Sequence, residues 1–437
     1  MNIPLSTTIE KNQPNLSTKK IIIIGAGPAG MMAAGRAAQA LQSTGATVAI
    51  LEQNDRMGKK LYITGKGRCN LTNNTDIQSL VKNVVTNPRF LQSAFHALPA
   101  QATMEFFENR NTPIKTERGG RVFPASDYSG HIIDALVINL KRMGVVIKRG
   151  CTVNHIEHDS KFLIHTSMGT FQADALIIAT GGLSYPSTGS TGDGYGFASS
   201  LGHNITSTHP SLVPLITEET WVKGLEGLSL KNISCKITAT DSQKKRPIYI
   251  ETGEMLFTAN GVTGPAILRA SAYAAGKLPA LLEIDLKPGL THEQLNARIL
   301  RDFTANQNKT FANAMEGLLP KRMIDVIVAI SQIPADKKVN AITKQERQTL
   351  TNLLKALPLT LKQTAGYKEA VITKGGVNVK EINPSTLMSK IIPGLFFAGE
   401  IIDVDALTGG YNLQIAFSTG HLAGQSAANY IGGGSND

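Results

Sequence analysis

Cysteines and paired metal-ligand motifs are scarce in this sequence of 437 residues. Its three cysteines, Cys69, Cys151 and Cys235, lie far apart, which excludes a disulfide framework and a cysteine metal site. Nine histidines are scattered and form no HExxH or HxH motif, so we expect no bound metal. This cysteine usage favours a reducing, cytoplasmic setting.

Long apolar runs are also missing. No run approaches the roughly 20 residues that cross a bilayer, so we expect no membrane span. The start of the chain, MNIPLSTTIEKNQPNLSTKK, lacks the apolar stretch of a signal peptide. We expect residues 1–19 to form a flexible polar tail and the rest to fold into two or three domains.

Acidic residues are too few to balance the basic ones, and the net charge is +11. Residues 211–365 contain 20 Lys and Arg against 14 Asp and Glu, so about half of the excess lies there. Short basic clusters occur at Lys244–Arg246, Lys321–Arg322 and Lys337–Lys338, without an aromatic and basic RNA-binding motif. The charge is either the footprint of a nucleic acid or ordinary surface solvation.

A glycine motif follows the first apolar run. Residues 19–41 read KKIIIIGAGPAGMMAAGRAAQAL, which predicts a buried strand, a GxGxxG turn and an alanine-rich helix. Gly25 permits the tight turn, Gly27 lets a pyrophosphate approach the backbone, and Gly30 lets the helix pack on the strand. The N-terminus of the helix then faces the phosphates.

An acidic residue ends the second predicted strand, ATVAILE, 22 residues after Gly30. Glu52 is placed to accept hydrogen bonds from ribose hydroxyls and to repel a 2′-phosphate, which disfavours NADP at this site. Strand, turn, helix and acid together predict a dinucleotide site. The alternative is a glycine-rich turn in another kind of α/β protein.

The later motifs do not continue the regular βαβ units of a simple NAD dehydrogenase. Residues 151–182 give three β-like runs that end in ADALIIATGG, a meander. Residues 393–424 give another apolar strand, LFFAG, then Glu400 and the pair Gly409-Gly410 before a helical run. A helix N-terminus there would stabilise a nearby negative charge, although the glycine pair alone is equally typical of a plain turn.

These three motifs, in this order, resemble those of the two-dinucleotide-binding-domain flavoproteins. The strings GKGRCNLTN, RVFPASD, ATGGLSYPSTGSTGDGYGFA and MLFTANGVTGPAIL, with residues 366–412, narrow the resemblance to the BaiN/RdsA-type flavoproteins. The resemblance runs from about Lys20 to Gly424. That family includes bile-acid enone reductases, aminoacetone-oxidase-like proteins and a ribosomal-RNA dihydrouridine synthase.

The resemblance implies an α/β fold with a Rossmann-like FAD-binding domain built from both chain ends and an inserted β-barrel-like plus helical domain. The sequence itself supports this division, because 211–290 is rich in short β-like runs and 291–360 has helical periodicity. We therefore expect an FAD-binding domain at 20–210 and 366–437, and an inserted substrate domain at 211–365.

The cofactor implied by the resemblance is FAD. The residues expected to contact it are Gly25, Gly27, Pro28, Ala29, Gly30, Glu52, Gln53, Lys60, Gly67, Arg68, Cys69, Asn70, Val153, Ala179, Thr180, Gly181, Gly399, Glu400, Asp403, Gly410, Tyr411, Asn412 and Leu413. No second GxGxxG is present for NAD(P)H, so we expect that donor to bind transiently in an open substrate cleft, if it is used.

The loop at 63–73, ITGKGRCNLTN, is not a P-loop, because the spacing of GxxxxGK[ST] is not met. Gly67 allows close approach of the backbone, and Arg68 and Asn70 offer donors to the pyrophosphate or the flavin edge. Relatives usually have a glycine where this chain has Lys66.

The proton donor for a reduction is Cys69, Tyr185, Tyr411 or solvent. Cys69 is the candidate catalytic residue, because Arg68 beside it would lower its pKa. The alternative is that Cys69 is a small side chain packed beside the flavin. A histidine acid or base is not expected, because Ala259 stands where relatives commonly have histidine.

Four residues are candidates for substrate binding: Arg118, Arg121, Tyr185 and Asn260. The two arginines either hold an anionic substrate or belong to a solvated face. Asp403 either binds flavin or substrate, or caps the following turn.

Three functions compete. The first is an NAD(P)H-dependent FAD reductase of an activated C=C bond, with a uracil of 23S ribosomal RNA or a small unsaturated molecule as substrate. The second is an FAD amine oxidase that produces peroxide. The third is a non-catalytic FAD-binding factor associated with the ribosome.

Overall fold

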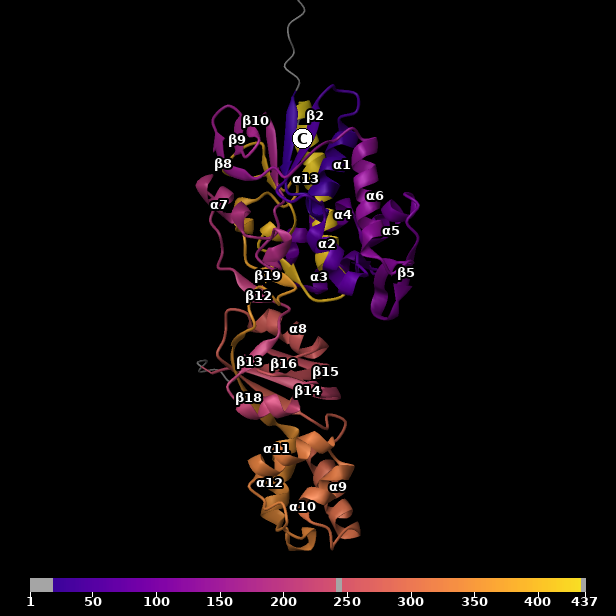
Figure 1. Cartoon of the computed structure of the whole chain (residues 1–437), viewed down its shortest axis with the longest axis vertical. Coiled ribbons are helices and arrows are strands. Elements are labelled where there is room, and N and C mark those ends of the chain that lie inside the picture. The colour runs from indigo at the N-terminus through magenta and orange to yellow at the C-terminus, as the bar shows by residue number, and fades with distance from the viewer. Residues whose placement is uncertain (1–18, 241–245, 434–437) are drawn as a thin grey trace, which may run out of the picture.

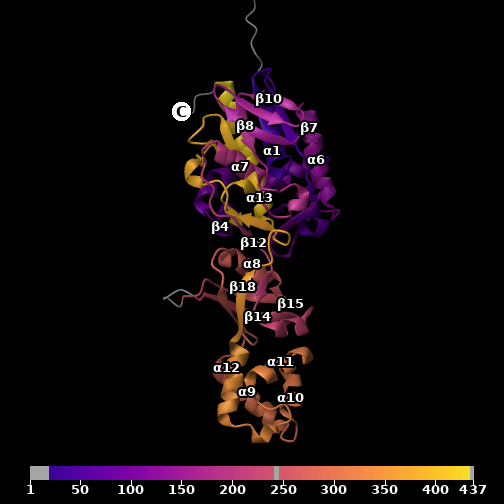
Figure 2. The same cartoon turned by 60° about the vertical axis from the view of Figure 1, so that its left-hand side comes forward.

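The computed structural model describes residues 19–240 and 246–433. Three bodies follow one another along the long axis of the molecule: an α/β domain, a β-barrel and a small helical unit (Figures 1 and 2). Residues 1–18 of the tail predicted at 1–19 and two members of the basic cluster, Lys244 and Lys245, lie outside the described residues. Lys19, the last residue of that predicted tail, donates from Nζ to Ile431 O at 2.7 Å.

The α/β domain is built on a five-stranded parallel sheet with the order β20-β11-β1-β2-β7. The strands are β1 (Lys20–Ile24), β2 (Thr47–Glu52), β7 (Val146–Arg149), β11 (Ala175–Ile178) and β20 (Leu395–Phe397). The four isoleucines of β1 are buried, as expected for a central parallel strand covered on both faces. β20 comes from the C-terminal part of the chain, so both chain ends build this sheet.

Small residues let two helices pack closely on the sheet. In α13 (Tyr411–Gly432), a Cβ at Gly420 would lie 2.3 Å from the carbonyl oxygen of Ala29 in α1 (Pro28–Ala40). A third helix, α6 (Ser129–Arg142), packs against α1. The antiparallel strands β8 (Val153–His158), β9 (Phe162–Thr166) and β10 (Gly169–Ala173) form a meander, which Figure 1 shows on the opposite side of the sheet from α1. The predicted last run of the meander, ADALIIATGG, instead forms β11 of the parallel sheet.

Shorter elements complete this domain. They are α2 (Lys59–Ile63), β3 (Thr72–Asn73), α3 (Ile77–Lys82), β4 (Val84–Thr86), α4 (Gln92–Ala97), α5 (Ala100–Glu108), β5 (Ile114–Glu117), β6 (Arg121–Pro124), α7 (Asp193–Ser200), β12 (His209–Ser211), β19 (Ile372–Lys374) and β21 (Asp405–Ala406). β12 and β19 pair antiparallel, so the outgoing and returning chain segments lie side by side where the barrel begins.

Six strands close into a barrel in the order β13-β16-β15-β14-β17-β18. They are β13 (Leu215–Thr217), β14 (Ser229–Ala239), β15 (Tyr249–Thr258), β16 (Gly261–Thr263), β17 (Ala280–Asp285) and β18 (Leu357–Thr364). A helix that the sequence did not predict, α8 (Pro265–Ala274), lies between β16 and β17 in the stretch expected to be β-rich. Its apolar face packs into the barrel core.

Helices fill the connection between β17 and β18. They are α9 (His292–Ala305), α10 (Phe311–Ala314), α11 (Lys321–Ser331) and α12 (Lys344–Lys355). Capping boxes begin α9 at Thr291 and α12 at Thr343, which satisfies backbone donors at both helix starts. None of the helices that the structure describes has the length and apolar composition needed to span a membrane.

The predicted fold class is confirmed: a Rossmann-like domain, a barrel and helices are all present. We keep the boundaries 20–210, 211–365 and 366–437 as a proposal. In its favour, the barrel strands run from Leu215 to Thr364.

Candidate functional site

A long pocket lies at the carboxyl ends of four parallel strands. Its walls include Ile24, Glu52, Ala179 and Ala398, each of which ends or directly follows β1, β2, β11 or β20. Open parallel sheets bind nucleotides at this edge. The pocket then continues to the first turn of α13, so its walls come from both chain ends.

The three motif glycines have three different geometries. A Cβ at Gly25, whose φ is +100°, would lie 2.6 Å from the carbonyl oxygen of Ala179. A Cβ at Gly30 would lie 1.9 Å from the carbonyl oxygen of Gly25, so helix and turn can touch only without it. At Gly27, which lines the pocket, a Cβ would meet no heavy atom within 4 Å. The open space is therefore at the glycine predicted to admit a pyrophosphate.

The carboxylate of Glu52 is buried and holds the glycine turn. Its Oε2 accepts a hydrogen bond from the backbone N–H of Ala26 at 2.7 Å. Its Oε1 accepts from the backbone N–H and the side-chain amide of Asn54, at 2.9 Å and 2.7 Å. An ionised carboxylate has about four lone-pair sites, so ribose hydroxyls can still donate to it.

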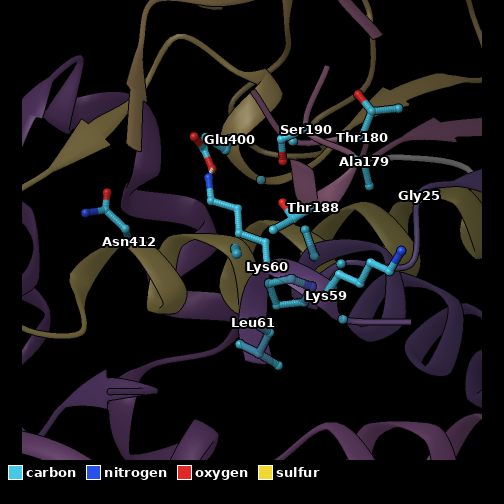
Figure 3. Close-up of a pocket in the computed structure, with 18 of the residues that line it drawn as sticks. Gly25, Lys59, Lys60, Leu61, Ala179, Thr180, Thr188, Ser190, Glu400 and Asn412 are labelled. Atoms are coloured by element: carbon cyan, nitrogen blue, oxygen red, sulfur yellow. Dashed lines mark hydrogen bonds and ion pairs between the residues drawn. The ribbon is translucent and has the colours of Figure 1, made fainter. Parts of the chain in front are cut away.

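An ion pair crosses the middle of the pocket (Figure 3). Lys60 Nζ lies 2.6 Å from Oε2 of Glu400 and donates to the hydroxyl of Ser184 at 2.5 Å. Oε1 of Glu400 accepts from Ser184 Oγ and from the backbone N–H of Thr373, each at 2.8 Å. Glu400, predicted as a cofactor ligand, is therefore held by three partners.

The start of α13 closes the far end of the pocket. Gly410 has φ +98°, and a Cβ there would lie 2.2 Å from the carbonyl oxygen of Thr72. The Asn412 amide accepts from Ala406 N–H at 2.9 Å and donates to Ala406 O at 2.8 Å, which fixes the preceding loop. The first turn of α13 contains no acidic residue, so the N–H groups at this helix end can face a negative charge.

Two buried polar atoms in the pocket wall lack partners among the described residues: Oδ1 of Asn70 and Oγ1 of Thr180. Buried polar atoms in proteins are nearly always hydrogen-bonded, so these two fit a site that is completed by a bound polar group. The open glycine turn, the Glu52 carboxylate and two helix N-termini on one pocket match the parts of a dinucleotide. The residues present therefore fit FAD.

Most of the predicted FAD contacts line this pocket. They are Gly25, Gly27, Pro28, Ala29, Glu52, Gln53, Lys60, Asn70, Val153, Ala179, Thr180, Gly181, Gly399, Glu400, Gly410, Asn412 and Leu413. The remaining predicted contacts do not line it: Gly30, Gly67, Arg68, Cys69, Asp403 and Tyr411. The packing role predicted for Gly30 agrees with its close contact with the backbone of Gly25.

The prediction that Arg68 donates to the cofactor is wrong in this structure. Its guanidinium donates from Nε to Asp127 at 2.8 Å and from Nη2 to Glu117. The same group lies over the Phe123 ring, 4.1 Å from the ring centroid. These two carboxylates raise the pKa of Arg68. The positive charge of Arg68 is therefore paired with the carboxylates of Glu117 in β5 and of Asp127.

The prediction that Arg68 lowers the pKa of Cys69 is also wrong. Cys69 is fully buried, and burial raises the pKa of its thiol to about 12. A weak hydrogen bond with Thr64 opposes that rise but does not cancel it. Cys69 is a small side chain in the core that does not line the pocket, and its packing beside the flavin stays a prediction.

Two further predicted cofactor residues lie beside the pocket. Asp403 accepts from the Asn87 amide through its backbone oxygen at 2.8 Å and its carboxylate at 3.2 Å. Burial raises the pKa of Asp403, and the hydrogen bond from Asn87 opposes the rise. Tyr411 follows Gly410 directly and lines a second hollow at the barrel junction.

The structure separates the four predicted substrate residues. Arg118 and Arg121 are exposed at the β5–β6 turn, next to the second hollow. Tyr185 and Asn260 line neither hollow. Asn260 is exposed in the turn between β15 and β16, where its backbone oxygen accepts from Thr217 N–H.

Sequence reasoning missed the residues that hold two carboxylates of the pocket wall. Ser184 and Thr373 hold Glu400, and Asn54 holds Glu52. Ser184 stands in the glycine- and serine-rich stretch after ATGG, which the sequence marks only as a loop. Thr373 has no local signal, because the pairing of β12 with β19 positions it to donate to Glu400. In the described residues, no group of three or more His, Cys, Asp or Glu could hold a metal ion.

Known proteins match nearly the whole chain. It is 32% identical over 414 residues to the 3-dehydro-bile acid delta(4,6)-reductase of Clostridium scindens, covering 94% of this chain and 99% of the relative. It is 30% identical to the ribosomal RNA dihydrouridine synthase of Escherichia coli, covering 92% and 96%. Among solved structures, E. coli quinol fumarate reductase FrdA aligns with a TM-score of 0.50 at 17% identity, covering 96% of this chain and 71% of that chain.

The fumarate reductase likeness supports the fold alone. The two sequence relatives are named for a reduction and for dihydrouridine synthesis, and they confirm the predicted resemblance and the oxidoreductase class. Residues 19–426 match the HI0933-like protein Rossmann domain. The chain therefore belongs to the HI0933-like protein Rossmann domain family.

Proposed function

We propose that the chain binds FAD in the long pocket. Glu52 would accept from the adenosine ribose, the turn at Gly27 would receive the pyrophosphate, and the α13 N-terminus would face the flavin ring. The observation that carries this proposal is the alignment of these groups on one pocket whose wall includes the unpartnered atoms of Asn70 and Thr180.

We propose further that the protein is an NAD(P)H-dependent reductase of an activated C=C bond. When bound, FAD supplies hydride transfer at its N5 atom. This chain's residues orient the cofactor, exclude water from it and present the substrate. A bile-acid delta(4,6)-reductase and a dihydrouridine synthase share one chemistry, since each name describes saturation of a C=C bond conjugated to a carbonyl.

The finer substrate that we propose is a uracil of 23S ribosomal RNA. The support is the name of the E. coli relative and a net charge of +11, which suits a polyanionic partner. A small unsaturated molecule is the competing substrate. The three cysteines are unpaired and buried, which suits work in a reducing cytoplasm.

The test is anaerobic mixing of the FAD-loaded protein with NADH or NADPH. Loss of the oxidised flavin absorbance is the expected result, and its absence at every concentration would remove the reductase proposal. Peroxide formation from small amines in air would instead identify an amine oxidase. Flavin that is inert in both assays would identify a non-catalytic FAD-binding factor.

A separate test addresses the RNA substrate. Large-subunit ribosomal RNA from a strain that lacks the gene should lose a dihydrouridine, and the intact gene should restore it. Unchanged RNA would leave the small-molecule substrate.

A further inference from the structure

A second pocket adjoins the proposed FAD pocket at the junction with the barrel. Leu407 lines both pockets, and Tyr411 in the second directly follows Gly410 in the first. Tyr273 of α8, which belongs to the barrel body, also lines the second pocket. A substrate in this pocket would therefore lie between the two bodies and next to the flavin end of the FAD pocket.

The lining of the second pocket is polar. Asparagine, threonine, serine and lysine side chains form most of the described wall, and its one aliphatic side chain is Leu407. Small-molecule sites for apolar ligands are lined mainly by hydrophobic and aromatic groups. A steroid skeleton would leave these amides and hydroxyls without partners, whereas a small polar ring would satisfy them.

Two amide oxygens in this wall remain available as acceptors. The Asn73 amide nitrogen donates to Gly119 O at 2.9 Å and Gly409 O at 3.0 Å, and that of Asn83 donates to Ser79 O at 2.8 Å. Within the described residues, no donor reaches Oδ1 of either asparagine. An imide N–H between two ring carbonyls, as in uracil, matches this pattern, because it donates to an amide oxygen while its carbonyls accept from hydroxyls.

A fixed aromatic ring faces the same space. Tyr273 stacks on Tyr249 with ring centroids 4.3 Å apart and an interplanar angle of 11°. The Tyr249 hydroxyl donates to Glu251 at 2.5 Å, and Arg269 donates to the same carboxylate at 2.7 Å. This network holds the Tyr273 ring in place, so a flat base can stack without ordering the ring first.

The rim of the pocket is basic. Lys82 lines it and is exposed, and Arg118 is exposed next to the lining residue Gly119. Within the described residues, neither Lys82 nor Arg118 forms an ion pair with a carboxylate. Both charges are therefore available to phosphates on either side of a bound nucleotide.

We propose that this second pocket binds one uracil-type base of a single RNA strand, with the Tyr273 ring for stacking, Asn73 and Asn83 for the base edge, and Lys82 and Arg118 for the backbone. The inference rests on the proposed reductase function, because it places the reducible ring beside the flavin. Proteins that act on a base bind it unpaired and out of its stack, which agrees with a pocket of this polarity.

The test uses the FAD-loaded, oxidised protein, so that no turnover occurs. A short fluorescent RNA with a single uridine is titrated, and anisotropy reports binding. We expect Tyr273→Ala to weaken binding about 5- to 100-fold and Tyr273→Phe to retain it, because the ring provides the stacking. Lys82→Ala should lower the slope of log K against log salt by about 0.7.

Matched controls are Tyr62→Ala and Lys141→Ala, two exposed residues away from this pocket, which should leave RNA binding unchanged. The flavin spectrum of each variant checks that FAD is retained. Equal binding by Tyr273→Ala and wild type, or displacement of the RNA by a bile-acid-type steroid at lower concentration than by uridine, would overturn the pocket assignment.

The two proposals fail in different ways. RNA binding that depends on Tyr273 without any flavin reduction by NAD(P)H would contradict the reductase proposal and support the assignment of the second pocket. Reduction of a small enone without RNA binding would support the reductase proposal and contradict the assignment of the second pocket.

Discussion

The ammonium group of Lys60 lies 2.6 Å from the carboxylate of Glu400, a residue 340 positions away in the chain. Their side chains are 20% and 17% exposed, so water screens the pair only in part. The contact joins the N-terminal and C-terminal parts of the α/β domain across the pocket. It therefore links the folding of the discontinuous domain to the shape of the proposed cofactor site.

A double-mutant cycle measures this link. We expect Lys60→Met and Glu400→Gln each to reduce the free energy of unfolding, because each leaves a partner without its charge, and to couple by about 1–2 kcal/mol. Urea unfolding of the four proteins without FAD gives the coupling. Strictly additive effects would mean that the two charges do not interact in solution.

Glu52 supports a prediction about cofactor affinity. Glu52→Gln replaces a charged acceptor that holds the Ala26 N–H and is available to ribose, and we expect the Kd for FAD to rise about 10- to 100-fold. Quenching of flavin fluorescence on titration measures it. The matched control is Glu108→Gln, an exposed residue at the end of α5, which should bind FAD like wild type. Equal affinities in both variants would contradict the placement of the ribose.

Lys66 supports a prediction about stability. Its φ of +59° lies in the left-handed region, where a side chain costs about 1 kcal/mol and glycine costs little. We expect Lys66→Gly to raise the free energy of unfolding by about 0.5–1 kcal/mol, even though glycine makes the unfolded chain more flexible.

The control for this substitution has the opposite sign. Lys141→Gly in the last turn of α6 should lower the free energy of unfolding by about 1 kcal/mol, since that backbone is helical. Urea unfolding compares the two variants. A destabilised Lys66→Gly protein would show that the lysine side chain contributes more than its backbone conformation costs.

Cys69 supports a prediction about pH and reactivity. Burial raises the pKa of its thiol to about 12, above the reference value of 9.0, so the folded state holds the proton more tightly than the unfolded state. The protonated thiol therefore contributes to the free energy of unfolding below pH 9. This contribution is lost as pH rises from about 9 towards 12. Cys69→Ala should remove that pH dependence.

The same substitution tests the catalytic alternative. Cys69→Ala should keep FAD and full turnover, and thiol reagents at mildly alkaline pH should label Cys69 only after unfolding. A large loss of turnover with FAD still bound would restore a catalytic role for this thiol.

The parts of the fold that local pattern determines were predictable from sequence. Four consecutive isoleucines, the GxGxxG turn and Glu52 specify β1, the pocket edge and the second strand, because each acts within a few residues of its neighbours. The predicted apolar strand LFFAG, which forms β20, and the glycine pair before α13 belong to the same group.

What could not be predicted depends on contacts between distant segments. Arg68 meets Glu117 and Asp127 across a hairpin, so its role as a cofactor donor was wrong. The Cys69 pKa depends on complete burial, which adjacency to an arginine does not reveal. Tyr273 reaches the second pocket from the barrel body, and no periodicity in the chain places it beside Tyr411.

The second half of the proposed reaction, transfer of hydride from reduced FAD to a C=C acceptor, tests the reductase proposal directly. The FAD-loaded protein is reduced with NAD(P)H under argon, freed of excess donor and mixed with a uridine-containing RNA or a conjugated enone. We expect the oxidised flavin absorbance to return at a rate that rises with the concentration of the C=C acceptor, with an equal amount of saturated product. Flavin that stays reduced with every C=C acceptor and is reoxidised only by oxygen would contradict it.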